Sequence, residues 1–131
     1  MTVTTKDLVD AAMDRVPSIA PQKAREMMEE RGALLLDVRD APELQSTGSA
    51  VGSHHVARGM LEFRADPDSP LHDRELRRDR PVVVHCAAGP RAALAGSLLL
   101  DMGYGEVYNM GGFKDWKAAG LPTNDPVDPG M

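Results

Sequence analysis

A strand, a short loop and a helix follow one another between residues 81 and 102, and this segment constrains the fold more than any other. Three consecutive valines, Val82–Val84, lie between a charged segment and a turn of small residues. A short, continuous apolar run of this kind is typical of a strand that is buried on both faces. Apolar residues then recur at helical spacing over 91–102. We therefore expect a buried strand at 81–85 with a helix packed on it.

Short apolar runs and helical patterns alternate along the rest of the chain. Further strands are expected at 33–38, 55–57 and 107–109. Helices are expected from Thr4 or Thr5 to Val16, from Pro21 to Gly32, and at 41–44, 59–63 and 113–119. The first helix is expected to bury Leu8, Ala11, Ala12 and Val16, and Gly111–Gly112 is expected to form a tight turn. This alternation predicts an α/β fold, with a mostly parallel central sheet covered by helices on both faces.

Length and charge exclude several classes of protein. The chain has 131 residues, which is the size of one domain, and a net charge of −5. A nucleic-acid partner is not expected, because binding to phosphates needs clustered Lys and Arg. The most apolar stretch, 92–100, is too short to span a membrane, and no targeting segment is visible at 1–10. We therefore expect a soluble cytoplasmic protein without a membrane partner.

Metal and disulfide sites are not expected either. The chain has one cysteine, so it has no internal disulfide and no multi-cysteine zinc site. His54 and His55 are adjacent, and adjacent residues of a strand point to opposite faces of the sheet. The sequence predicts no bound metal and no cofactor.

The single cysteine, Cys86, lies where a ligand would bind in a parallel sheet. It follows the expected strand and precedes the expected helix, at the edge where the strands end. A helix N-terminus and free amides favour an anion, including a thiolate, and Ala87, Ala88 and Gly89 leave such amides accessible. Arg91 adds a forked cationic donor for an anionic substrate. A lone cysteine is often only a small buried apolar residue, but this position favours a nucleophile.

Three segments of the chain resemble the single-domain rhodanese family of sulfurtransferases. They are Leu34-Leu35-Leu36-Asp37-Val38-Arg39 with Glu43 after it, the C-x-x-G-x-R loop of Cys86 to Arg91, and Asp101-Met102-Gly103-Tyr104 followed by Asn109-Met110-Gly111-Gly112-Phe113 and Trp116. The segment 55–63 is also similar. The resemblance covers 20–122 and implies a rhodanese-like fold, with a five-stranded sheet flanked by helices. We expect 1–19 to be a helical extension packed on this domain and 123–131 to be a frayed tail.

The resemblance implies a ping-pong transfer of sulfur. A small anionic donor such as thiosulfate would be attacked by Cys86, which would carry the sulfur as a persulfide. The amides of Ala87, Ala88, Gly89 and Arg91 would hold its charge, and the Arg91 side chain would orient the donor. Since the chain has no second cysteine, the sulfur should pass to an external acceptor: a thiol such as glutathione, a thioredoxin-like protein, or cyanide.

Four further residues are candidates for supporting roles. Asp37 and Arg39 match the pair that ends a strand in the family, and we expect them to be mainly structural. Glu43 lies either in the wall of the site or on the surface, and Arg58 lies either at the mouth of the site or on the surface. The loop holds no basic residue before Arg91, so a less charged persulfide or polysulfide donor would fit as well as thiosulfate.

Two other functions remain alternatives. The start of the loop, His85-Cys86-Ala87-Ala88-Gly89, also looks like that of cysteine phosphatases and arsenate reductases. Those enzymes place five residues between cysteine and arginine, whereas four separate Cys86 from Arg91 here. The other alternative is a rhodanese-like module that only binds a partner. Such modules typically lack the cysteine.

Overall fold

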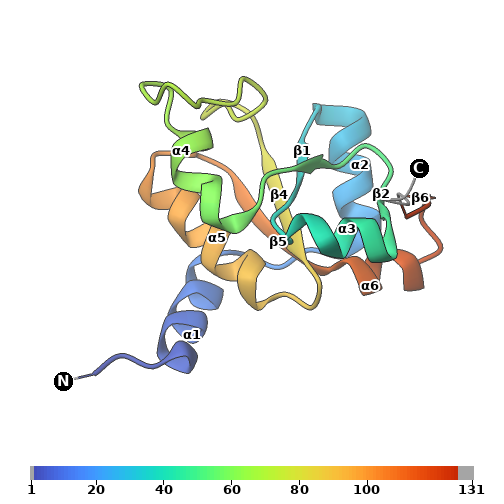
Figure 1. Cartoon of the computed structure of the whole chain (residues 1–131), viewed down its shortest axis with the longest axis horizontal. Helices are drawn as coiled ribbons and strands as arrows, with labels where there is room; N and C mark the ends of the chain where they lie inside the picture. The colour runs from blue at the N-terminus through green and yellow to red at the C-terminus, as the bar shows by residue number, and fades with distance from the viewer. Residues whose placement is uncertain (1, 127–131) are drawn as a thin grey trace.

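A four-stranded parallel sheet forms the centre of the computed structural model, which describes residues 2–126 (Figure 1). The strands lie in the order β3 (His54–His55), β1 (Leu34–Asp37), β4 (Val82–Cys86) and β5 (Val107–Gly112). Each neighbouring pair is parallel. The expected α/β fold with a mostly parallel sheet is confirmed.

The helices and a small second sheet complete the fold. The helices are α1 (Thr5–Arg15), α2 (Pro21–Arg31), α3 (Ala41–Thr47), the 3-10 helix η1 (Arg58–Met60), α4 (Leu61–Ala65), α5 (Pro90–Asp101) and α6 (Phe113–Ala118). The second sheet is an antiparallel pair of β2 (Ser49–Ala50) with β6 (Thr123–Asn124). No helix among residues 2–126 is both long enough and apolar enough to cross a membrane.

Different helices cover the two faces of the parallel sheet. Leu34 and Leu36 belong to a core that includes buried residues of α4 and α5, whereas Leu35 and Val83 belong to a core with Trp116 of α6 and with α2. In the view of Figure 1, α4 and α5 accordingly lie on one side of the strands and α2 and α6 on the other. Because successive residues of a strand point to opposite faces, one apolar run contributes to both cores.

The sheet has four strands in the described part of the chain, not the expected five. A single parallel bridge between Ser18 and Asn109 extends it beyond β5. The Asn109 amide donates to the Pro17 carbonyl at 2.8 Å, and the Ile19 amide donates to the Asn109 carbonyl at 3.0 Å. The pairing stops there because Pro17 and Pro21 enclose the segment and proline has no amide hydrogen to donate.

The glycine pair is not a tight turn. Gly111 and Gly112 are the last residues of β5, and the pairing of β5 with β4 shifts its register between Val84 and His85. Gly111 has φ +95°, which is a conformation that glycine adopts readily. The positive φ therefore occurs at an irregularity in the strand, beside the functional loop, and the chain does not reverse its direction there.

The two ends of the domain also differ from expectation in part. Ala12 and Val16 of the first helical segment are buried, and Arg15 donates to the Ser97 hydroxyl of α5 at 2.9 Å, but Leu8 and Ala11 are exposed. At the other end, Thr123–Asn124 is a strand rather than part of a frayed tail, because Ser49–Ala50 offers a partner. Residues 127–131 of the expected tail lie outside the described residues.

Candidate active site

Cys86 is the last residue of β4 and lies at the entrance to α5. Its side chain is 1% exposed, and the Gly89 amide donates a hydrogen bond to Sγ at 2.9 Å. Gly89 adopts φ +122°, and Pro90 then begins the helix. The chain therefore folds back over the sulfur within three residues, and a reactant must enter the loop to reach it.

Residues at the end of β5 contact this loop and form a hydrogen bond with it. The Asn109 side-chain amide donates to the Gly89 carbonyl at 3.3 Å, and its oxygen accepts from the Gly111 amide at 2.8 Å. Gly112 lies so close to the loop that a Cβ there would be 2.0 Å from the Ala87 carbonyl oxygen. Sequence reasoning missed the role of Asn109. The available signal was an Asn two residues before a glycine, the spacing at which Asn commonly bonds its own backbone.

Asp37 and Arg39 form a buried ion pair at the end of β1. Both side chains are at most 2% exposed, and Arg39 Nη2 lies 2.8 Å from Asp37 Oδ2. Arg39 also donates to the Thr47 hydroxyl and to the Gly48 carbonyl, each at 2.8 Å, and its guanidinium lies 4.5 Å from the centre of the Phe113 ring. The pair ties β1 to the end of α3 and to the start of α6. Leaving one partner of a buried pair without the other typically costs ~3–5 kcal/mol.

Glu43 and Arg91 form a two-pronged ion pair between α3 and α5. Arg91 Nη1 lies 2.7 Å from Glu43 Oε2, and Nη2 lies 2.8 Å from Oε1. The hydrogen bonds from Arg91 lower the pKa of Glu43 from 4.5 to about 2, helped by the Asp40 amide and opposed by partial burial. The same contact raises the pKa of Arg91 above its ordinary value. Both groups are therefore charged at any ordinary pH, and Arg91 already holds one carboxylate.

A Glu43→Gln variant is expected to lower the free energy of unfolding by ~1 kcal/mol at pH 7. Solvent screens this pair, because the Arg91 and Glu43 side chains are 38% and 32% exposed. The folded pKa of Glu43 lies below the unfolded one, so its contribution is complete above pH 4.5 and is lost as the pH falls toward 2. Urea unfolding at several pH values would measure the difference from the wild type. A difference that stays constant down to pH 2 would contradict the role of the Glu43 charge.

A matched control for this experiment exists on α2. Arg25 Nε lies 3.0 Å from Glu29 Oε1, and the two side chains are 41% and 64% exposed. A single contact of this kind on a helix surface contributes ~0.3–0.5 kcal/mol. We expect Glu29→Gln to change the unfolding free energy by less than Glu43→Gln.

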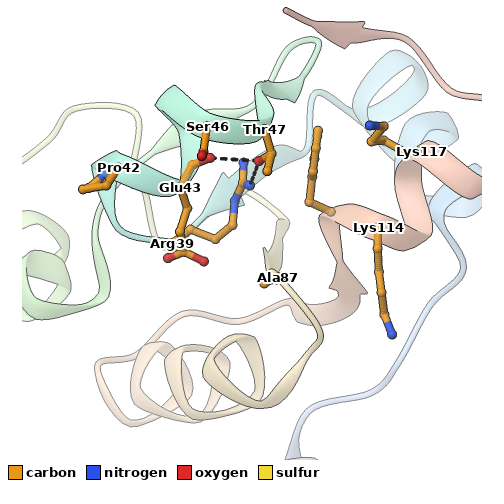
Figure 2. A pocket seen from close by; sticks show the side chains of 9 residues that line it. Arg39, Pro42, Glu43, Ser46, Thr47, Ala87, Lys114 and Lys117 are labelled. Carbon is orange, nitrogen blue, oxygen red and sulfur yellow. Dashed lines mark hydrogen bonds between the residues drawn. The ribbon is translucent and has the colours of Figure 1, made fainter. Parts of the chain in front are cut away.

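A cavity of about 540 Å³ opens beside the loop (Figure 2). It is lined by Arg39, Pro42, Glu43, Ser46, Thr47, Ala87, Phe113, Lys114 and Lys117. Glu43 is thus part of the wall of the cavity, which is one of the two positions expected for it. Sequence reasoning missed Lys114 and Lys117. The available signal was that the two lysines follow the glycine pair and are three residues apart, a spacing that places them on one side of a helix.

Several of the predicted site residues do not line this cavity: Asp37, Arg58, Cys86, Ala88, Gly89 and Arg91. Arg58 donates to Glu62 at 3.0 Å and is not among the residues that line the cavity. His85 is fully buried and burial lowers its pKa, so the imidazole is neutral. Its Nδ1 lies 3.3 Å from the Cys86 carbonyl oxygen, and its Nε2 lies 3.8 Å from Asp37.

Comparison with known proteins identifies the family. The model of the rhodanese-like domain matches residues 20–119. The chain is 37% identical to the thiosulfate sulfurtransferase GlpE of Actinobacillus succinogenes over 106 residues, which cover 79% of this chain and 86% of that protein. It is 32% identical to GlpE of Vibrio cholerae over 111 residues, which cover 84% and 96% of the two chains.

Solved structures share the fold of this chain. A Rhodopseudomonas palustris protein of unknown function, described as a possible tyrosine phosphatase, superimposes with a TM-score of 0.85 at 32% identity and covers 95% of this chain and 96% of its own. The polysulfide-sulfur transferase of Wolinella succinogenes superimposes with a TM-score of 0.75 at 34% identity and covers 96% and 90%. The chain belongs to the single-domain rhodanese family and is a rhodanese-type sulfurtransferase.

Proposed function

We propose that this protein moves sulfane sulfur from thiosulfate or a persulfide donor to a thiophilic acceptor through a persulfide on Cys86. The observation that carries the proposal is the hydrogen bond of 2.9 Å from the Gly89 amide to Cys86 Sγ. It lies at the N-terminus of α5, a helix of 12 residues. An amide donor and the positive end of a helix both favour the thiolate, which is the nucleophilic form of cysteine.

The proposed reaction has two steps that balance without an oxidant or a reductant. In the first, Cys86 Sγ forms a bond to the outer sulfur of thiosulfate, and the sulfur–sulfur bond of thiosulfate breaks with its electron pair on the departing sulfite. In the second, an acceptor thiolate forms a bond to the outer sulfur of the persulfide. The bond between that sulfur and Sγ then breaks, and the Cys86 thiolate is restored. The Gly89 amide would stabilise the charge near Sγ in both steps.

Arg91 is proposed to orient the anionic donor from the same loop. Its guanidinium is held by Glu43 through contacts of 2.7 and 2.8 Å, so a donor would share this cation with a carboxylate. The remaining amides of the loop, those of Ala87, Ala88 and Arg91, are proposed to hold the outer sulfur of the persulfide. Asp37 and Arg39 would hold α3 in a fixed position relative to the loop. Arg58 is assigned no part in the reaction.

The acceptor is proposed to be an external thiol, a thioredoxin-like protein or, in the test tube, cyanide. The chain has a single cysteine, so a Cys86 persulfide has no internal thiol with which to form a disulfide. A cytoplasmic location, with its reduced thiol pool, fits this proposal. The names of the relatives refer to two donors, thiosulfate for GlpE and polysulfide for the Wolinella protein, and both are carried into the test.

Phosphatase chemistry is the second candidate, because a similar structure is described as a possible tyrosine phosphatase. Four residues separate Cys86 from Arg91, one fewer than in the cysteine phosphatases that the loop resembles. A shorter loop surrounds a smaller space, which favours a single sulfur over a tetrahedral phosphate. The presence of Cys86 disfavours a module that only binds a partner.

Intact-mass spectrometry of the reduced protein tests the proposal. After mixing with thiosulfate or polysulfide, we expect the mass to rise by one sulfur atom and to return to its starting value with cyanide. Because the chain has one cysteine, a gain that cyanide reverses places the sulfur on Cys86. If neither donor adds sulfur, the proposal is wrong. Release of p-nitrophenol from p-nitrophenyl phosphate would then support the phosphatase.

A further inference from the structure

The cavity beside Cys86 is larger than the sulfur donors require. Its volume is about 540 Å³, which is within the range of ~300–1,000 Å³ that is usual for sites of organic ligands. Thiosulfate has about five non-hydrogen atoms. A water molecule, which has one, occupies ~30 Å³ in the liquid, so thiosulfate is much smaller than the cavity. Most of the cavity would therefore stay empty of reactant if it held only such a donor or cyanide. The space suits an organic molecule of the size of a short peptide.

The charges around the cavity are unevenly balanced. Arg39 is paired with Asp37 behind it, and Glu43 is paired with Arg91. Lys114 and Lys117 also line the cavity, and neither forms a salt bridge with any residue between 2 and 126. The chain as a whole has a net charge of −5, so this local excess of positive charge opposes the overall sign. A cavity of this kind attracts an anion.

The two lysines and Phe113 form one side of the cavity, which we call the α6 wall. Lys117 Nζ lies 5.9 Å from the centre of the Phe113 ring, at the limit of a cation–π contact. Figure 2 shows Lys114 and Lys117 on one side of the cavity, the α3 residues on the other side, and Ala87 between the two. Ala87 follows Cys86 in the chain, so the cavity adjoins the loop that carries the reacting sulfur, while Cys86 itself does not line it.

We infer that the α6 wall binds the carboxylates of a peptide-sized thiol, such as glutathione, which accepts the sulfur from Cys86. This inference rests on the proposed function. The aromatic ring offers an apolar surface to the backbone of the ligand, and the two ammonium groups offer charge to its carboxylates. The thiolate of the ligand forms a bond to the outer sulfur of the persulfide, and the bond between that sulfur and Sγ breaks with its electron pair on Sγ.

The test compares two acceptors on variants of the α6 wall. Wild type, Lys114→Gln with Lys117→Gln, and the control Lys23→Gln would each be loaded with thiosulfate and discharged with glutathione or with neutral 2-mercaptoethanol. Lys23 is an exposed lysine of α2 in a long contact of 3.8 Å with Glu26. We expect the double variant to lower kcat/KM for glutathione about three- to tenfold relative to 2-mercaptoethanol, through a rise in KM. The ratio should also fall with added salt in the wild type.

The results separate this inference from the proposed function. Mass spectrometry first shows whether the variants gain one sulfur from thiosulfate. If they do, and the ratio of the two acceptors is the same in all three proteins, the α6 wall does not bind the acceptor and only this inference fails. If the wild type gains no sulfur, both fail. A matching fall with Lys23→Gln would assign the effect to overall charge and would also overturn the inference.

Discussion

A Cys86→Ser variant is expected to take up no sulfur from thiosulfate or polysulfide and to transfer sulfur at least about a thousandfold more slowly than the wild type. A thousandfold loss corresponds to ~4 kcal/mol of transition-state stabilisation. Serine keeps the size of the side chain and can accept the hydrogen bond that the Gly89 amide now donates at 2.9 Å. It cannot form a thiolate near neutral pH or carry a persulfide. Steady-state release of thiocyanate from thiosulfate and cyanide would measure the loss.

The folded state of this variant needs a separate check. Cys86 is 1% exposed and packs among core residues such as Val84 and Ala92, so a hydroxyl there loses some stability. Urea unfolding would show whether the variant is folded under the assay conditions. A folded Cys86→Ser protein that keeps the wild-type rate within about tenfold would make Cys86 an ordinary buried cysteine. The sulfur would then be carried elsewhere.

The centre of the site could be predicted from the sequence because its determinants are local. Three valines predict β4, and the small residues after Cys86 with a proline at the start of α5 predict the loop. Each depends on residues that are neighbours in the chain. The position of Cys86 at the edge where the strands end follows from this order alone.

The surroundings of the loop could not be predicted in the same way, because they are contacts between distant segments. Glu43 and Arg91 are 48 residues apart in the chain, and no local pattern reports that α3 and α5 bring them together. The lysines of α6 reach the cavity only because β5 ends beside β4. Sequence reasoning therefore underestimated the positive charge near Cys86.

The glycine pair shows how a correct pattern can give a wrong structure. Adjacent glycines are typical of a turn, and Gly111 does have a positive φ of +95°. The structure uses the two residues within β5 instead. Gly111 lies at the irregularity in the strand, and Gly112 lets Ala87 approach the strand closely. The sequence pattern correctly indicated that glycine is required at these positions. It could not indicate that the requirement comes from the strand irregularity and the close approach of the loop.

A Gly112→Ala variant is expected to lower kcat/KM for sulfur transfer by about ten- to a hundredfold. The added Cβ would lie 2.0 Å from the Ala87 carbonyl oxygen and 2.9 Å from the Ala88 Cα. These are backbone atoms, so no side-chain rotation relieves the overlap, and either β5 or the loop must move. A displacement of about 1 Å near reacting groups can cost ~10²-fold in rate. We also expect a loss of ~1–3 kcal/mol in unfolding free energy, as in other overpacked sites.

Gly59→Ala is the matched control for this effect. Gly59 lies in η1, and a Cβ there would meet nothing within 4 Å. We expect this variant to keep its rate and to change the unfolding free energy by no more than ~0.5 kcal/mol. Rates of persulfide formation and unfolding curves for both variants would separate a displaced loop from a general loss of stability. If Gly112→Ala loads sulfur as fast as Gly59→Ala, close contact between β5 and the loop is not what holds Cys86 in its reactive position.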